Sequence, residues 1–201
     1  MGKLGIVIAC LIVLATAFLA HQPVAPGLAG TAYAMQQPAQ PATLVEEVKN
    51  MYTRIQGFIT ASATQFPEDK YTWQPTPEVR SWARLIAHVA DDNNGTCSSV
   101  VGEKPPARLD TPNSAESAAN KMSKADLEKA LADSAAVCGK AFAAVTPDNM
   151  MERAGNRSKI GALTYNTSHI NEHYGNLVTY MRLQNMVPPS SAGRGRGGMQ
   201  Q

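Results

Sequence analysis

Proline-rich loops divide this chain into four segments, each of which carries one apolar face. Apolar residues recur at alternating spacings of three and four over about 43–64, 80–101, 123–145 and 158–185, a pattern typical of amphipathic helices. The intervening loops FPEDKYTWQPTPEVR and EKPPARLDTPN contain prolines, which a helix interior does not accept. No segment shows the alternation of a half-buried strand. Because none of the four is apolar on every side, we predict an all-α four-helix bundle over residues 43–187.

The N-terminal region resembles an export signal rather than part of the bundle. An uncharged run of 17 residues follows Lys3, and Ala32-Tyr33-Ala34 further on matches a cleavage pattern of small residues. We therefore predict a signal peptide over 1–34 and a polar linker over 35–42. A retained membrane anchor remains the alternative, because the apolar run is close to the length that spans a bilayer. Either interpretation predicts an exported protein, and cleavage of the signal would leave it without membrane attachment.

Charge gives no indication of a nucleic-acid or lipid partner. The chain has 18 basic and 16 acidic residues, and removal of Lys3 with the signal leaves a net charge of +1. A surface this close to neutral offers no electrostatic attraction for nucleic acid or acidic lipid. The C-terminal residues 188–201 are predicted to be a disordered tail from their composition. The sequence leaves the oligomeric state open, with a homodimer among the alternatives.

Two cysteines remain after removal of the signal. Cys97 and Cys138 fall on the apolar sides of the second and third segments, and an even pair in an oxidising compartment favours a disulfide. Such a bridge closes a loop of about 40 residues and would stabilise the fold by about 3–4 kcal/mol. Two buried free thiols are the alternative.

Three histidines are left in the mature chain, and all three fall near the expected core. His169 and His173 lie four residues apart, so they project from consecutive turns of one helix face. His88 follows Leu85 on the inner edge of the second segment. Imidazoles brought together in a dry interior lose hydration without compensation unless they share a partner. We therefore predict a three-histidine site for a divalent metal ion with an open fourth position. Hydrogen bonds to nearby polar groups are the alternative.

Two carboxylates lie close to this predicted site. Asp91 and Asp92 follow His88 by three and four residues, so either could orient its ring from outside the ligand shell. A solvated pair at the rim of the bundle is an equally good interpretation. The zinc-protease pattern H-E-x-x-H is not met, since Glu172 directly precedes His173 instead of following His169.

Two stretches resemble the DinB-like superfamily, particularly its small exported members. They are WxxxxxHVAD from Trp82 to Asp91 and NEHYGNLVTYMRLQNMVPPSS from Asn171 to Ser191. The resemblance extends over about 43–191. It implies an up-down-down-up bundle with one long crossover. It also implies one histidine on the second helix and an H-x-x-x-H pair on the fourth around a zinc or nickel ion, and His88, His169 and His173 match those places.

The resemblance also limits what the protein is expected to do. Characterised relatives of this kind are metal-dependent transferases and isomerases that use small thiols, while many others have no established activity. Those thiols belong to the cytosol, so export favours hydrolysis as strongly as thiol transfer. We expect a small-molecule substrate for either reaction. A non-catalytic metal-binding or stress-related interaction protein is the alternative.

Overall fold

The structure is a computed structural model, and it describes residues 42–111 and 117–192. The predicted signal peptide and most of the linker lie outside these residues, as does the end of the predicted tail. Four long helices make up most of the described chain. They are α1 (Leu44–Gln65), α2 (Trp82–Val101), α3 (Lys124–Ala144) and α4 (Lys159–Leu183). Their bounds agree with the predicted segments to within about two residues, and the predicted all-α bundle is confirmed.

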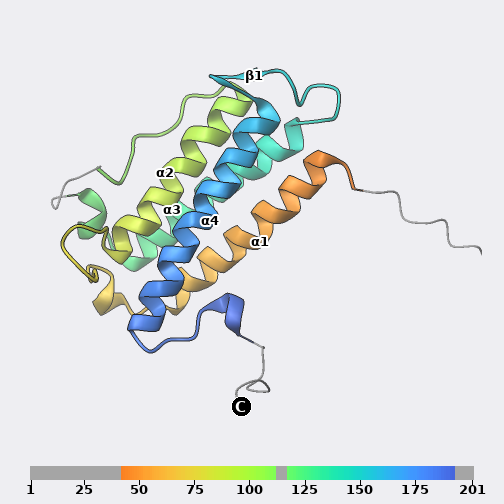
Figure 1. Ribbon diagram of the computed structural model, residues 1–201. Coiled ribbons are helices and arrows are strands. Elements are labelled where there is room, and N and C mark those ends of the chain that lie inside the picture. The colour runs from red at the N-terminus through yellow and green to blue at the C-terminus, as the bar shows by residue number, and fades with distance from the viewer. Residues whose placement is uncertain (1–41, 112–116, 193–201) are drawn as a thin grey trace, which may run out of the picture. The chain divides into compact units, whose positions relative to one another are not determined.

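The helices follow an up-down-down-up order (Figure 1). The helices α1 and α4 run in one direction and α2 and α3 in the other, so the connection after α2 returns along the bundle before α3 begins. Each of α1 and α2 packs against both α3 and α4. This order brings α2 and α4, the two helices that carry the histidines, side by side.

Each long helix begins at a hydroxyl side chain that accepts a hydrogen bond from the backbone of the first turn. Thr43 forms a full capping box with Glu46 at the start of α1. Gly102 ends α2 with φ of 75°, a left-handed conformation that a side chain disfavours. These local signals fix where the bundle turns, and they place the loops at its two ends.

The core contains a stacked aromatic pair and a disulfide. The Phe66 and Trp82 rings stack with centroids 3.7 Å apart, and both are fully buried. The predicted bridge between Cys97 and Cys138 is present and joins α2 to α3. In the part of the chain that is described, none of the helices has the length and apolar character needed to cross a bilayer.

Two features differ from the sequence prediction. A two-stranded antiparallel hairpin, β1 (Arg153–Ala154) with β2 (Arg157–Ser158), precedes α4 where we predicted no strand. These strands are two residues long, too short to show an alternating pattern. Within the predicted disordered tail, η3 (Pro189–Ser191) is a short 3-10 helix, and the Ser190 backbone N–H donates to the Tyr174 hydroxyl at 3.0 Å. Two further 3-10 turns, η1 (Glu68–Lys70) and η2 (Ala118–Lys121), lie in the loops.

Candidate metal centre

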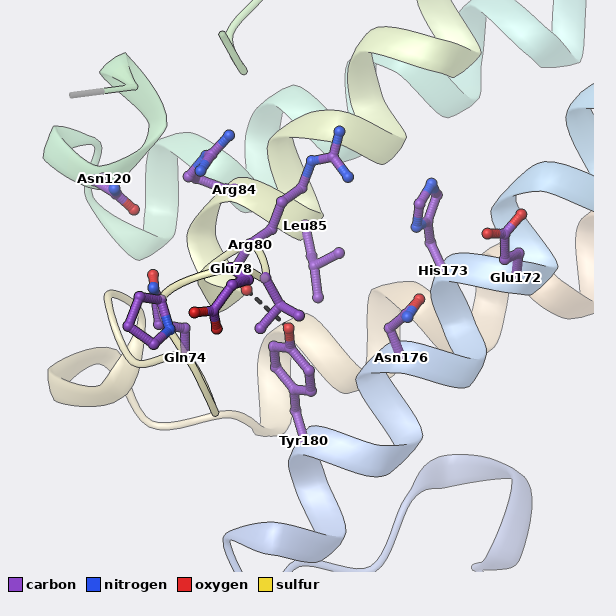
Figure 2. Close-up of a pocket in the computed structure, with 12 residues that line it drawn as sticks. Gln74, Glu78, Arg80, Arg84, Leu85, Asn120, Glu172, His173, Asn176 and Tyr180 are labelled. Atoms are coloured by element: carbon purple, nitrogen blue, oxygen red, sulfur yellow. Dashed lines mark hydrogen bonds between the residues drawn. The ribbon is translucent and has the colours of Figure 1, made fainter. Parts of the chain in front are cut away.

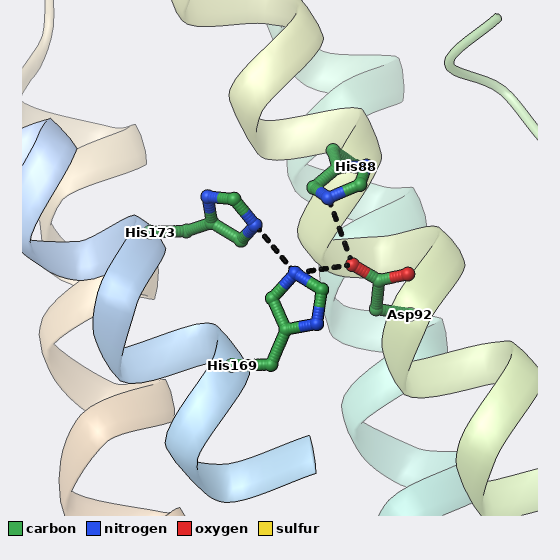
Figure 3. Close-up of side chains that lie close together, drawn as sticks. All are labelled: His88, Asp92, His169 and His173. Carbon is green, nitrogen blue, oxygen red and sulfur yellow. Dashed lines mark hydrogen bonds and ion pairs between the residues drawn. The ribbon is translucent and has the colours of Figure 1, made fainter. Parts of the chain in front are cut away.

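The three histidines converge between α2 and α4 (Figure 3). His88 extends from α2, and His169 and His173 extend from consecutive turns of α4. The Nε2 atoms of His169 and His173 lie 2.7 Å apart. Two neutral nitrogens with their lone pairs facing each other would repel at this distance, so the contact needs a shared proton or a shared cation. The predicted convergence of the histidines is present.

Asp92 adds an oxygen to the same point. Its Oδ2 atom lies 3.0 Å from His88 Nε2 and 3.5 Å from His169 Nε2. One ligand atom from each of these four residues falls within 4.8 Å of all the others. We predicted that Asp92 would act from outside the ligand shell around an open fourth position, whereas the structure places its carboxylate among the candidate ligands. The i, i+4 spacing on α2 puts Asp92 on the face of His88.

Asp91 differs from its predicted role. Its carboxylate contacts none of the histidines and instead accepts hydrogen bonds from the backbone N–H groups of Leu109 and Asp110, at 2.9–3.0 Å. At i+3 from His88 the side chain is rotated towards the loop that follows α2. Burial raises the pKa of Asp91, and the two backbone donors oppose that shift. Asp91 therefore holds the loop and does not orient a ligand.

Asp110 is the acidic residue that sequence reasoning missed. Its side chain is fully buried, and its Oδ2 atom lies 3.7 Å from His88 Nδ1. The same carboxylate accepts from Arg80 Nε at 3.0 Å and from Arg84 Nε at 2.8 Å. Burial alone would raise the pKa of Asp110, but the two arginines outweigh it and lower that pKa. Asp110 is 22 residues from His88 in the sequence, on an irregular loop, so no spacing could have indicated it.

The electrostatics of the cluster keep the ligand atoms available. Burial, followed by the charges of His88 and His169, lowers the pKa of His173 to about 4, so this imidazole is neutral at pH 7. Burial alone would raise the pKa of Asp92, but its hydrogen bond and charge interaction with His88, together with the charge of His169, lower it. A neutral imidazole and an ionised carboxylate are the forms that bind a cation.

The donor set and its spacing fit a divalent transition metal ion. Tetrahedral zinc with bonds of about 2.0–2.1 Å holds its ligand atoms roughly 3.3 Å apart, and the contacts of 2.7, 3.0 and 3.5 Å lie around that value. Three imidazoles and one carboxylate suit zinc, nickel and neighbouring metals.

The sequence of this chain matches a known protein family. The sequence profile of the DinB superfamily matches residues 51–177, which include His88, Asp92, His169 and His173. The protein belongs to the DinB superfamily. This match confirms the predicted resemblance, and the matched range includes all four residues of the candidate centre. The comparison with curated proteins gave no match.

Solved structures share the DinB-like fold at low sequence identity. One is described as a conserved protein from Enterococcus faecalis, with a TM-score of 0.57 and 17% identity over 71% of this chain and 97% of that one. Another is a mycothiol-dependent maleylpyruvate isomerase, with a TM-score of 0.51 and 15% identity over 68% of this chain and 63% of that one. At these identities the likeness establishes the fold.

Proposed function

We propose that this DinB-like protein is an exported, metal-dependent enzyme that acts on a small molecule. His88, Asp92, His169 and His173 would hold one divalent ion, with zinc or nickel as the candidates. The observation that supports this most strongly is that four ligand atoms from two helices lie within 4.8 Å of one another. Two buried imidazoles and a half-buried one with this geometry are costly to maintain unless the atoms share a cation.

The chemistry would be Lewis-acid activation. A bound divalent ion lowers the pKa of a water or thiol beside it and so supplies a nucleophile at neutral pH. The residues of the chain would hold the ion, and the negative charge of Asp92 would offset part of the positive charge. A cavity of about 630 Å³ has His173 in its wall and gives a small molecule a route to the cluster.

Hydrolysis and thiol transfer remain the two candidate reactions, and each has its own support. The disulfide between Cys97 and Cys138 fits an oxidising compartment, where small thiols are not kept reduced, and so favours hydrolysis. The structural neighbour described as a mycothiol-dependent isomerase favours thiol chemistry. The predicted signal at residues 1–34 supports export together with the disulfide.

Metal content tests the first part of the proposal. The mature protein, purified from native cells without a nickel column, should contain about one divalent ion per chain by elemental analysis. The variant His88→Gln/His169→Gln/His173→Gln should contain none, while Asp133→Asn on the exposed face of α3 should retain the ion. Wild-type protein that binds no more metal than the triple variant would disprove the metal centre.

A non-catalytic role is supported by one observation, the position of Asp92. Four protein ligands close a tetrahedral site, and closed sites are usually structural. Cobalt(II)-substituted protein separates the two roles, because its visible absorption changes when a small anion binds to the ion. A changed spectrum on addition of azide would support catalysis. An unchanged spectrum at saturating azide would favour a structural or binding role.

A further inference from the structure

The cavity beside His173 is polar, and its residues come from several parts of the chain (Figure 2). The cavity is lined by residues of the loop before α2, of α2, of η2 and of α4. Glu78, Arg80, Arg84, Glu172 and Tyr180 are among the polar residues that line it. The composition of this lining suits a small polar ligand better than a hydrocarbon.

Arg80 presents an unused part of its guanidinium group within this cavity. Its Nε atom donates to Asp110 at 3.0 Å, and 31% of its side chain is exposed. Its two terminal amino groups donate no hydrogen bond within residues 42–111 and 117–192. The Tyr180 hydroxyl donates to the Arg80 carbonyl oxygen at 2.8 Å, which ties the backbone of Arg80 to α4. The guanidinium is thus held at one edge while its other nitrogens remain available to a ligand.

The charge near Arg80 is not fully compensated by its buried partner. Asp110 is shared between Arg80 and Arg84, so one carboxylate serves two guanidinium groups. Arg84 is satisfied further by the Thr111 carbonyl oxygen at 3.1 Å. Glu78 and Glu172 also line the cavity, but both are exposed to solvent, where water screens their charge. The inner part of the cavity therefore offers the positively charged guanidinium group of Arg80, whereas its solvent-exposed opening carries the acidic Glu78 and Glu172.

Arg80 also lies close to the histidine cluster. The Oδ2 atom of Asp110 that accepts from Arg80 is 3.7 Å from His88 Nδ1, so a single carboxylate oxygen separates the arginine from a candidate metal ligand. His173 and Arg80 line the same cavity. A ligand with one end on Arg80 could therefore present another of its atoms to the cluster.

We propose that Arg80 is the binding residue for a carboxylate group on the small-molecule ligand. A planar carboxylate can accept two parallel hydrogen bonds from the free edge of a guanidinium group, and this geometry holds the rest of the ligand in one orientation. The acidic opening favours a ligand whose opposite end is neutral or cationic. This binding site rests on the proposed function, because its cavity is the route to the metal centre. Small carboxylates are then the substrate class of the enzyme.

Binding to the metal-free mature protein tests the proposal separately from the metal. 4-Aminobutyrate and its amide, 4-aminobutanamide, which lacks the carboxylate, are titrated by isothermal calorimetry, and the Nε–H signal of Arg80 in the wild type is followed by NMR. 4-Aminobutyrate should shift that signal, and the calorimetric affinity of Arg80→Gln for it should be at least tenfold weaker than that of the wild type. Arg80→Lys, which keeps the charge and loses the fork, should fall between them. Arg153→Gln removes an equal charge from exposed β1 and should bind like wild type.

Three results would overturn the assignment. They are equal weakening by Arg80→Gln and Arg153→Gln, equal affinity for 4-aminobutyrate and 4-aminobutanamide, and tighter binding of inorganic phosphate than of 4-aminobutyrate. Metal stoichiometry of Arg80→Gln is measured in parallel and should remain at the wild-type value. A failed carboxylate site with normal metal content, or the reverse, shows which of the two proposals is wrong.

Discussion

His88 and Asp92 lie one turn apart on α2, and 3.0 Å separates His88 Nε2 from Asp92 Oδ2. An imidazole nitrogen and a carboxylate oxygen this close either share a proton or bind a common ion. The same oxygen also faces His169 on α4. Asp92 is therefore the residue at which the two helices of the site meet, and its removal is informative.

Asp92→Asn should weaken metal binding by at least the roughly 10- to 100-fold that removal of a residue outside the ligand shell costs. The substitution keeps the size of the side chain but removes the negative charge and one acceptor oxygen. Competition with a chromophoric chelator measures the affinity. The adjacent Asp91→Asn variant is the matched control, because Asp91 binds the backbone of the following loop. Equal losses of affinity in the two variants would contradict the assignment of Asp92 as a ligand.

The metal-free protein should lose stability as the pH falls from about 6.5 towards 4. Burial and the charges of His88 and His169 lower the pKa of His173 to about 4, whereas the unfolded chain titrates near 6.5. In this window the unfolded state binds a proton that the folded state does not, so acid favours unfolding, by at most about 3 kcal/mol in total. Above pH 6.5 the contribution is complete.

Urea denaturation of the metal-free protein at intervals between pH 7 and 4 measures this effect. The variant His173→Gln should show a shallower loss of unfolding free energy over the same range. An identical pH dependence in the variant and the wild type would show that His173 is not responsible.

Removal of the disulfide should destabilise the bundle by about 3–4 kcal/mol, because the bridge closes a loop across a sequence separation of 41 residues. The variant Cys97→Ala/Cys138→Ala and the reduced wild type should both unfold at lower urea concentrations than the oxidised protein. Metal stoichiometry should stay the same, since the bridge joins α2 to α3, whereas the four candidate ligands lie on α2 and α4. A loss of metal on reduction would contradict this separation.

Asp110→Asn should destabilise the fold by about 3 kcal/mol or more. Arg84 would then lack its buried counter-charge, and a buried charge without a partner is costly. Thermal and urea unfolding measure the loss. Asp133→Asn breaks an exposed ion pair with Lys129 and should cost less than about 0.5 kcal/mol. Comparable effects of the two substitutions would show that the Asp110 network contributes little.

Sequence patterns were sufficient to predict the four-helix bundle, because the bounds and inward faces of its helices depend on local sequence. Apolar spacing gave the four helices, proline marked the loops, and i, i+4 spacing placed His169 and His173 on one face. The histidine on α2 could be linked to that pair by its position on the inner edge and by the family resemblance. The pairing of Cys97 with Cys138 followed from helix phase in the same way.

The parts that sequence could not give depend on where loops return in space. Asp91 and Asp92 both lie within about one turn of His88 on α2, so helix spacing alone allowed either to act beside it, and the path of the following loop gives Asp91 its backbone partners instead. Asp110 and Arg80 lie in irregular segments with no periodicity, so their meeting beside His88 depends on tertiary packing alone. The hairpin before α4 was missed because two residues cannot display a pattern.

The loop after α2 carries Asp110 to a point between two arginines and a histidine. A change in the length of this connection would withdraw that carboxylate without altering any candidate ligand. His88 and Arg80 would then lose a shared neighbour at the same time. Related chains could in this way acquire different metal preferences or ligands through insertions and deletions in a surface loop, while the four helices and their histidines stay the same.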